Sequence, residues 1–174
     1  NDEVLERIDS LAQQTSELLQ SSAELADSGL VVEKSELVDI NQVVQRIAST
    51  VIPDNAVFEM DELPKIQGDS QRIKQIIQNL LHNAVDHRHQ NLIEVRKVRS
   101  RTGMTLLVIN DGEVIPNDIK GSIFKRGFTT KGEGRGLGLT IVKKLVEAHG
   151  WTIEIDLTDK TVFKITIPKS SIRG

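Results

Sequence analysis

The spacing of apolar residues separates a long amphipathic start from a globular remainder. From Val4 to Leu25, apolar or small residues recur at alternating spacings of four and three, which predicts a helix with a stripe wide enough for a helical bundle. A lone helix of this length cannot bury such a face, so we expect it to pack on a partner helix or on a second copy of the chain. Packing on its own globular domain is the alternative. Gly29 is placed to end this helix, and residues 31–38 are interpreted as a linker.

In residues 39–168 the spacing of apolar positions is typical of helices in some segments and of strands in others. Three helices are expected: 39–51, which starts at the capping residue Asp39; 69–85, capped by Asp69; and 139–149, ended by Gly150. Strands are expected at 57–60, 92–98, 105–110, 152–157 and 161–167. The inward positions of the helices are Ile40, Val43, Val44, Ile47, Val51, Ile73, Ile76, Ile77, Leu80, Leu81, Ala84, Val85, Ile141, Val142, Leu145 and Val146. This order predicts an α/β fold, an α+β two-layer sandwich with a mixed sheet of about five strands covered on one face by about three helices, and residues 169–174 as a tail.

Composition narrows the class of protein. The formal net charge is −3 with dispersed basic residues, so no basic stripe is present and nucleic acid is excluded as a partner. The chain has no cysteine, which excludes thiolate zinc sites and cysteine nucleophiles and fits a reducing, cytoplasmic setting. No apolar run approaches the roughly 20 residues that cross a bilayer, so we expect no membrane contact by this piece. A start at Asn1 without a methionine indicates a fragment or a processed chain.

Two asparagines on the second globular helix are candidates for metal chemistry. Asn79 and Asn83 are four residues apart and therefore share one line of the helix, expected opposite the apolar stripe. Amide oxygens suit Mg²⁺ that takes its remaining ligands from water and phosphates. Two solvated polar residues would give the same pattern, so the pair is weak on its own.

A run of glycines leads directly into the last helix. Gly132, Gly134, Gly136 and Gly138 alternate, which suits a loop whose backbone amides approach an anion, and the following helix N-terminus favours phosphate there. The alternative is a hinge loop. No buried strand precedes the run and no lysine-serine or lysine-threonine pair follows it, so neither common phosphate-binding motif applies.

Two shorter segments complete the candidate chemistry. Residues 110–116 place a polar pair and a glycine after a strand. A polar side chain could lie there at the rim of a pocket, and the glycine would leave room for a flat ring. The alternative is that the segment is a plain turn. Phe124 and Phe128 are four residues apart between this segment and the glycine run, a spacing that helical core packing would also explain.

Taken in order, these segments resemble the catalytic domain of sensor histidine kinases, a branch of the gyrase, Hsp90, histidine kinase and MutL ATPases. Residues 75–84 are similar to the asparagine box, 110–116 to the first glycine box, 124–128 to the phenylalanine box and 134–139 to the second glycine box of the nucleotide lid. The resemblance extends over 39–168 with the closing hairpin, and residues 1–30 resemble the second helix of the dimerisation and phosphotransfer hairpin.

The resemblance implies ATP and Mg²⁺ as cofactors and transfer of the γ-phosphoryl group to a histidine upstream of this chain. Asn83 would hold the metal, Asn79 would lie beside the phosphates as the second catalytic residue, and Asn110 with Gly112 would read adenine. The implied nucleotide-binding set is Asn79, Asn83, His87, Asn110, Gly112, Ile115, Phe128, Thr129, Thr130, Lys131, Gly134, Arg135, Gly136, Leu137, Gly138 and Leu139. The implied partners are a response regulator receiver domain and, through the N-terminal helix, a second copy of the intact protein.

Three positions depart from the family pattern. Asn110 stands where aspartate is usual, Val114 replaces a glycine, and Asp86 replaces a lysine or arginine. An acid beside phosphates is unfavourable, and Arg88 or the lid residues Lys131 and Arg135 would have to offset it, so we expect modest nucleotide affinity.

None of His82, His87, His89 or His149 has the setting of a phosphoacceptor, because none is followed by an acid. His82 and His149 are interpreted as structural or solvated, and the acceptor is expected outside this chain.

Other functions remain open at this point. Hydrolytic ATPases and serine kinases of the same fold carry a glutamate at the position of Asn79, and an asparagine cannot serve as their base. A pseudokinase that acts as a dimerising interaction module is the non-enzymatic alternative, kept open by Asp86 and Val114.

Overall fold

The computed structural model describes Val4, Ala12, Val32 and residues 34–87, 91–112, 116–125, 138–157 and 159–174. The expected N-terminal helix falls almost wholly outside these residues and stays a prediction. The elements are β1 (Glu36–Asp39), α2 (Ile40–Val51), β2 (Val57–Met60), β3 (Lys65–Gly68), α3 (Ser70–Asp86), β4 (Leu92–Arg99), β5 (Gly103–Asn110), η1 (Asn117–Ser122), α4 (Gly138–Ala148), β6 (Thr152–Leu157), β7 (Thr161–Pro168), η2 (Lys169–Ser171) and β8 (Ile172–Arg173).

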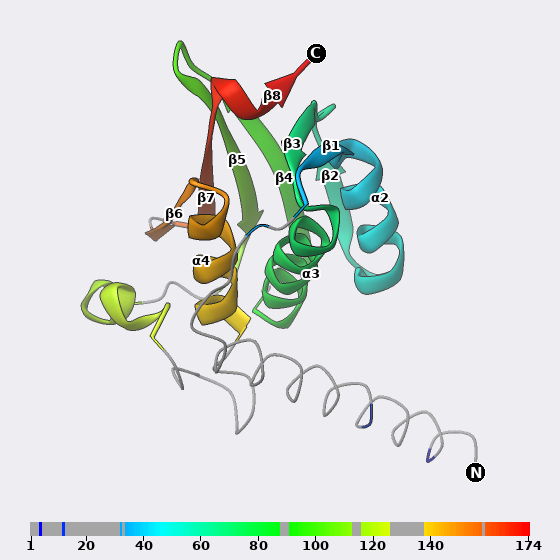
Figure 1. Cartoon of the computed structure of the whole chain (residues 1–174). Coiled ribbons are helices and arrows are strands. Elements are labelled where there is room, and N and C mark those ends of the chain that lie inside the picture. Colours follow the sequence, from blue (N-terminus) through cyan, green and yellow to red (C-terminus); the bar gives the residue numbers. More distant parts are fainter. Residues whose placement is uncertain are drawn as a thin grey trace.

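The main sheet has five strands in the order β2-β4-β5-β7-β6. β2 runs parallel to β4, and the other neighbours are antiparallel. Helices α2, α3 and α4 lie together on one face of this sheet (Figure 1). The expected two-layer sandwich with a mixed sheet is therefore confirmed.

The helices form where capping residues and apolar stripes predict them. The Asp39 side chain accepts the Gln42 N–H at 3.1 Å, and Asp69 accepts the N–H groups of Gln71 and Arg72 at 3.0 and 3.2 Å, so both predicted caps are confirmed. Among the expected inward positions, Ile47, Val51 and Val85 are only partly buried and the others belong to the buried core.

A second, three-stranded sheet was not predicted. Its order is β1-β3-β8, so residues 36–38, expected in the linker, and residues 172–173, expected in the tail, are strands instead. Their sequences, ELVD, KIQG and IR, are short and hold only one or two apolar residues each, so they give little of the alternation from which strands are predicted. This small sheet therefore depends on pairing between distant segments, which no local pattern reveals.

Helices α3 and α4 run in opposite directions beside each other (Figure 1). The start of α3 meets the end of α4, where the Asp69 N–H donates to His149 Nε2 at 3.1 Å. Consequently the end of α3 and the start of α4 both lie at the opposite edge of the sheet, where β5 also ends.

Candidate nucleotide site

The described members of the predicted nucleotide set lie on three elements. Asn79, Asn83 and His87 belong to α3 and its C-terminal cap, Asn110 and Gly112 end and follow β5, and Gly138 and Leu139 begin α4. α3 and β5 meet directly, because Asn110 Nδ2 donates to the main-chain oxygen of His87 at 3.4 Å. The fold thus brings segments far apart in the sequence to one edge of the sheet.

The two asparagines of α3 are half-buried. We expected them opposite the apolar stripe, but the exposed line of this helix is made by residues such as Lys74, His82 and Asp86. The stripe is broad, so positions one step beside it flank the core instead of facing bulk water. Asn79 and Asn83 therefore lie where a ligand packed beside the helix could reach their amide oxygens.

Asn110 is the most informative side chain of the site. It is only 1% exposed. Its Nδ2 donates a hydrogen bond to the His87 oxygen, whereas its Oδ1 has no hydrogen-bond partner within the described part of the chain. A buried acceptor left without a donor costs about 1–3 kcal/mol. A ligand that donates a hydrogen bond, as the amino group of adenine does, would remove this cost.

Gly112 permits a close approach of two main-chain segments. A Cβ at this position would lie 1.9 Å from the His87 oxygen and 2.5 Å from Asn110 Nδ2, so no larger residue fits without displacing the end of α3. The glycine predicted to make room for a flat ring also makes room for the carbonyl that holds Asn110.

The start of α4 has the physical properties of an anion-binding element. The first N–H groups of a helix lack intrahelical acceptors and carry partial positive charge, which favours phosphate by about 0.3–1 kcal/mol. Thr140 Oγ1 in the first turn donates to the Phe124 main-chain oxygen at 3.0 Å, and the Phe124 ring meets Phe163 of β7 edge to face, with centroids 6.3 Å apart. These contacts fix the start of α4 relative to the sheet.

Several predicted site residues lie outside the described part of the chain. They are Ile115, Phe128, Thr129, Thr130, Lys131, Gly134, Arg135, Gly136 and Leu137, together with Arg88 and Val114. Their roles stay predictions. Asp86 is described and exposed.

Thr161 was not identified from the sequence. It is 3% exposed and pairs with Asn110 across β5 and β7. A second polar side chain is therefore buried beside Asn110, the candidate adenine-binding residue. In the sequence it looked like an ordinary hairpin residue after the turn. Its only signal was a polar residue at an inward position of a strand.

The carboxylates with clearly lowered pKa values lie on or directly after strands, and none belongs to the predicted nucleotide-binding set. Glu94 accepts hydrogen bonds from Arg96 at 2.8 Å and from Lys160 at 3.0 Å, which lower its pKa. Asp61 accepts the Lys97 N–H at 2.9 Å, and this bond is the main cause of its lowered pKa. These groups stabilise the sheet and take no part in the candidate site.

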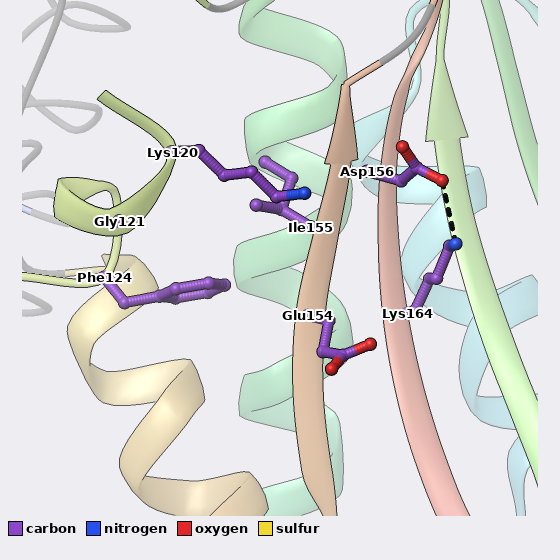
Figure 2. A pocket seen from close by; sticks show the side chains of 7 residues that line it. All are labelled: Lys120, Gly121, Phe124, Glu154, Ile155, Asp156 and Lys164. Carbon is purple, nitrogen blue, oxygen red and sulfur yellow. Dashed lines mark hydrogen bonds and ion pairs between the residues drawn. The ribbon is translucent and has the colours of Figure 1, made fainter. Parts of the chain in front are cut away.

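A separate groove of about 590 Å³ lies between η1 and the edge strand β6 (Figure 2). Its lining residues are Lys120, Gly121, Phe124, Glu154, Ile155, Asp156 and Lys164. Asp156 and Lys164 form an ion pair at 2.9 Å, and the hydrogen bond from Lys164 lowers the Asp156 pKa. None of the predicted nucleotide-binding residues lines this groove.

Comparison with known proteins identifies the family. Residues 68–171 match the family described as histidine kinase-, DNA gyrase B-, and HSP90-like ATPase. The chain belongs to this family.

Relatives within this family are sensor histidine kinases. Sensor histidine kinase ZraS of Escherichia coli O157:H7 is 36% identical over 128 residues, which are 69% of this chain and 28% of ZraS. Sensory histidine kinase/phosphatase NtrB of Azospirillum brasilense is 32% identical over 123 residues, 61% of this chain and 31% of NtrB. The chain thus spans less than a third of the length of these curated relatives.

Two solved structures of histidine kinases share the fold of this chain over almost their whole length. The mycobacterial sensor histidine kinase MprB is 28% identical with a TM-score of 0.69, over 76% of this chain and 97% of that one. The catalytic domain of histidine kinase ThkA is 29% identical with a TM-score of 0.68, over 78% of this chain and 96% of that one. The chain is therefore an ATP-binding catalytic domain of the sensor histidine kinase type. In the part that the structure describes, no helix is long and apolar enough to span a membrane.

Proposed function

We propose that this domain binds ATP with Mg²⁺ and, within a longer kinase, transfers the γ-phosphoryl group to a histidine that lies outside this chain. The observation that supports it best is the buried Asn110, whose Oδ1 lacks a donor among the described residues. The adenine amino group would supply the hydrogen-bond donor that this acceptor lacks.

Four parts of the described site have a role in this proposal. Asn110 accepts a hydrogen bond from the adenine amino group, and Gly112 lets the base approach the end of β5. The start of α4 receives phosphate oxygens, and Asn83 contributes an amide oxygen to Mg²⁺ while Asn79 contacts the phosphates beside it. The ion, when bound, neutralises charge on the phosphates. The lid residues, including Lys131 and Arg135, are proposed to cradle those phosphates.

The residue at position 79 favours transfer to a histidine over hydrolysis. Phosphoryl transfer depends mainly on positioning and on neutralisation of charge, so this domain needs little acid-base chemistry of its own. Activation of water does need a base, and the Asn79 amide cannot accept a proton. The family relatives are also named as kinases, which weighs against a pseudokinase.

The remaining proposals follow from this activity. A response regulator receiver domain would take the phosphoryl group from the histidine, and two copies of the intact kinase would associate through the N-terminal helix. Because the reaction consumes ATP, we place the domain in the cytoplasm.

Calorimetric titration of ATP with Mg²⁺ into this chain tests the proposal. We expect saturable binding that weakens without the metal and weakens about tenfold to a hundredfold in Asn83→Ala, because a contact with a charged group contributes about 1.5–3 kcal/mol. His82→Ala, an exposed substitution on the same helix, is the matched control and should bind as the unmodified chain does.

Two results would contradict the proposal. A folded chain that binds no nucleotide at millimolar concentration would rule out an active kinase domain. Steady release of phosphate from ATP by the chain alone would instead support a hydrolytic ATPase, despite the asparagine at position 79.

A further inference from the structure

One end of the molecule carries five exposed basic side chains, and we infer that it binds an acidic, extended segment of a partner protein. This basic end lies where β5 begins, whereas the candidate nucleotide site lies where β5 ends. The inference is therefore independent of the proposed function. The five residues of the basic end are Lys65 on β3, Arg99 and Arg101 on the hairpin of β4 and β5, Lys169 in η2 and Arg173 on β8.

These residues are dispersed between positions 65 and 173, and only the fold brings them together. The Lys169 N–H donates to the Thr102 main-chain oxygen at 2.8 Å, which places η2 against the turn that carries Arg101. β8 follows η2 directly and pairs with β3, where Arg173 lies opposite Lys65. The hairpin, η2 and β8 thus lie next to one another at the top of Figure 1, and their cations form a row.

The charge of this row is not neutralised by the described part of the chain. None of its five side chains forms an ion pair there, and this includes Lys65, although the exposed Glu62 is three residues away. Elsewhere in the sheet, Arg96, Lys160 and Lys164 are all paired with carboxylates. The chain has 25 acidic and 22 basic residues, so carboxylates are not scarce. The positive charge is a local feature that would attract a complementary anion.

Arg173 is oriented by the main chain in a way that suits a carboxylate. Its Nη1 donates to the oxygens of Ser170 and Ile172 at 2.8 and 3.1 Å. Its Nε and Nη2 have no acceptor among the described residues, and together they offer two parallel N–H groups to the two oxygens of a carboxylate. Lys65 lies directly opposite, and like charges opposed across two strands repel each other. The neighbouring Asp39 uses its carboxylate at the start of α2, so an acidic ligand would relieve this repulsion.

The arrangement favours an extended protein segment over a lipid surface or nucleic acid. A membrane attracts basic residues through its overall surface potential and does not need an oriented guanidinium. A row that follows the hairpin, η2, β8 and β3 in turn suits a chain that presents carboxylates at the strand rise of about 3.3 Å per residue. The net charge of −3 disfavours a nucleic-acid backbone as the ligand.

Fluorescence anisotropy of a labelled oligoglutamate peptide, titrated with the full chain, tests the inference. Oligoglutamine of the same length is the neutral control peptide and should not bind. Binding of oligoglutamate should weaken with added salt, because the screening length falls from about 30 Å at 0.01 M to about 8 Å at 0.15 M. Lys169→Glu combined with Arg173→Glu should weaken it by about tenfold or more, since two attractions become repulsions.

Two further variants separate the basic end from net charge. Lys74→Glu combined with Lys144→Glu changes the net charge equally, but these exposed lysines lie on α3 and α4. Affinity for the peptide should then stay within about twofold of the unmodified chain. Arg173→Lys keeps the charge and loses the paired N–H groups, so it should weaken binding by about twofold to fivefold. Circular dichroism checks that each variant is folded.

Several outcomes would overturn the inference. They are no binding of oligoglutamate even at low salt, equal losses in the two double variants, or no loss in the double variant of the basic end. Vesicles of phosphatidylserine and phosphatidylcholine are the rival ligand: if the chain sediments with them through the same residues and ignores the peptide, the occupant is a lipid surface. If the variant of Lys169 and Arg173 does not fold, Arg99→Glu combined with Arg101→Glu on the exposed hairpin replaces it, with the same expected loss. Titration with ATP is a separate measurement, so the proposed function stands or falls without these results.

Discussion

Replacing His149 by alanine is expected to lower the free energy of unfolding by about 2–4 kcal/mol. His149 follows α4 and joins it to the start of α3, because its Nε2 accepts the Asp69 N–H at 3.1 Å. Its Nδ1 then carries the proton and donates to the Leu145 oxygen at 2.7 Å. The ring also stacks on Trp151, with centroids 4.4 Å apart and planes 27° apart.

The magnitude follows from these three contacts. Two hydrogen bonds contribute about 0.5–1.5 kcal/mol each, and the aromatic pair about 0.5–1.5 kcal/mol. The side chain is half-buried, so a modest loss of packing adds to them. For a chain of this size, 2–4 kcal/mol corresponds to a fall in melting temperature of roughly 4–16 °C.

Urea unfolding followed by far-ultraviolet circular dichroism measures this change without relying on the fluorescence of Trp151, which touches the substituted ring. His149→Phe keeps the stack and loses both hydrogen bonds, so its stability should lie between those of the unmodified chain and His149→Ala. His82→Ala is the control, since His82 is exposed and should change stability by no more than about 0.5 kcal/mol. If His149→Ala were as mild as His82→Ala, the contact between α3 and α4 would not stabilise the domain.

Two further predictions concern the sheet. Hydrogen bonds from Arg96 and then Lys160 lower the pKa of Glu94 below its ordinary value of 4.5, so the stabilisation is present above that pH and is lost as the pH falls through the lowered value. Glu94→Gln should therefore cost about 1–2 kcal/mol at pH 7, and urea unfolding should show the difference shrinking in acid; a difference that stays constant would contradict this origin. A Cβ at Gly103 would lie 2.1 Å from a main-chain oxygen of β7, so Gly103→Ala should destabilise the domain by about 1–3 kcal/mol in the same assay. Gly121→Ala, where a Cβ meets nothing within 4 Å, should be tolerated, and equal effects at the two glycines would refute the steric argument.

Local patterns predicted the main elements because each carried its own signal. Asp69 caps α3 through its own side chain, and Gly150 takes a φ of 75° just after α4, as expected for a residue that ends a helix. The small β1-β3-β8 sheet carries no such signal, since its pairing joins residues near position 66 to residues near positions 37 and 172. Long-range pairing of very short strands was therefore the part of the fold that sequence could not supply.

The candidate site likewise has features that the sequence could predict and features that it could not. The positions of Asn83 on a helix and Asn110 at a strand end could be predicted, because each depends on the residue and its neighbours in sequence. What holds Asn110 could not, because its partner is a main-chain oxygen 23 residues earlier in the chain. A main-chain group has no residue type of its own, so no sequence pattern identifies it.

The antiparallel packing of α3 and α4 explains why the site forms at one edge of the sheet and not at the other. Where α3 starts and α4 ends, main-chain groups of the helix ends form hydrogen bonds within the protein. Asp69 accepts N–H groups at the start of α3, and the His149 ring donates to the Leu145 oxygen at the end of α4. At the near edge the negative end of α3 and the positive end of α4 lie side by side (Figure 1). A ligand whose base donates to Asn110, beside the end of α3, and whose phosphates lie at the start of α4 would be complemented by both elements at once. The packing of α3 against α4 thus brings the N-terminus of α4 to the side of the sheet where the Oδ1 of Asn110 lacks a hydrogen-bond donor among the described residues.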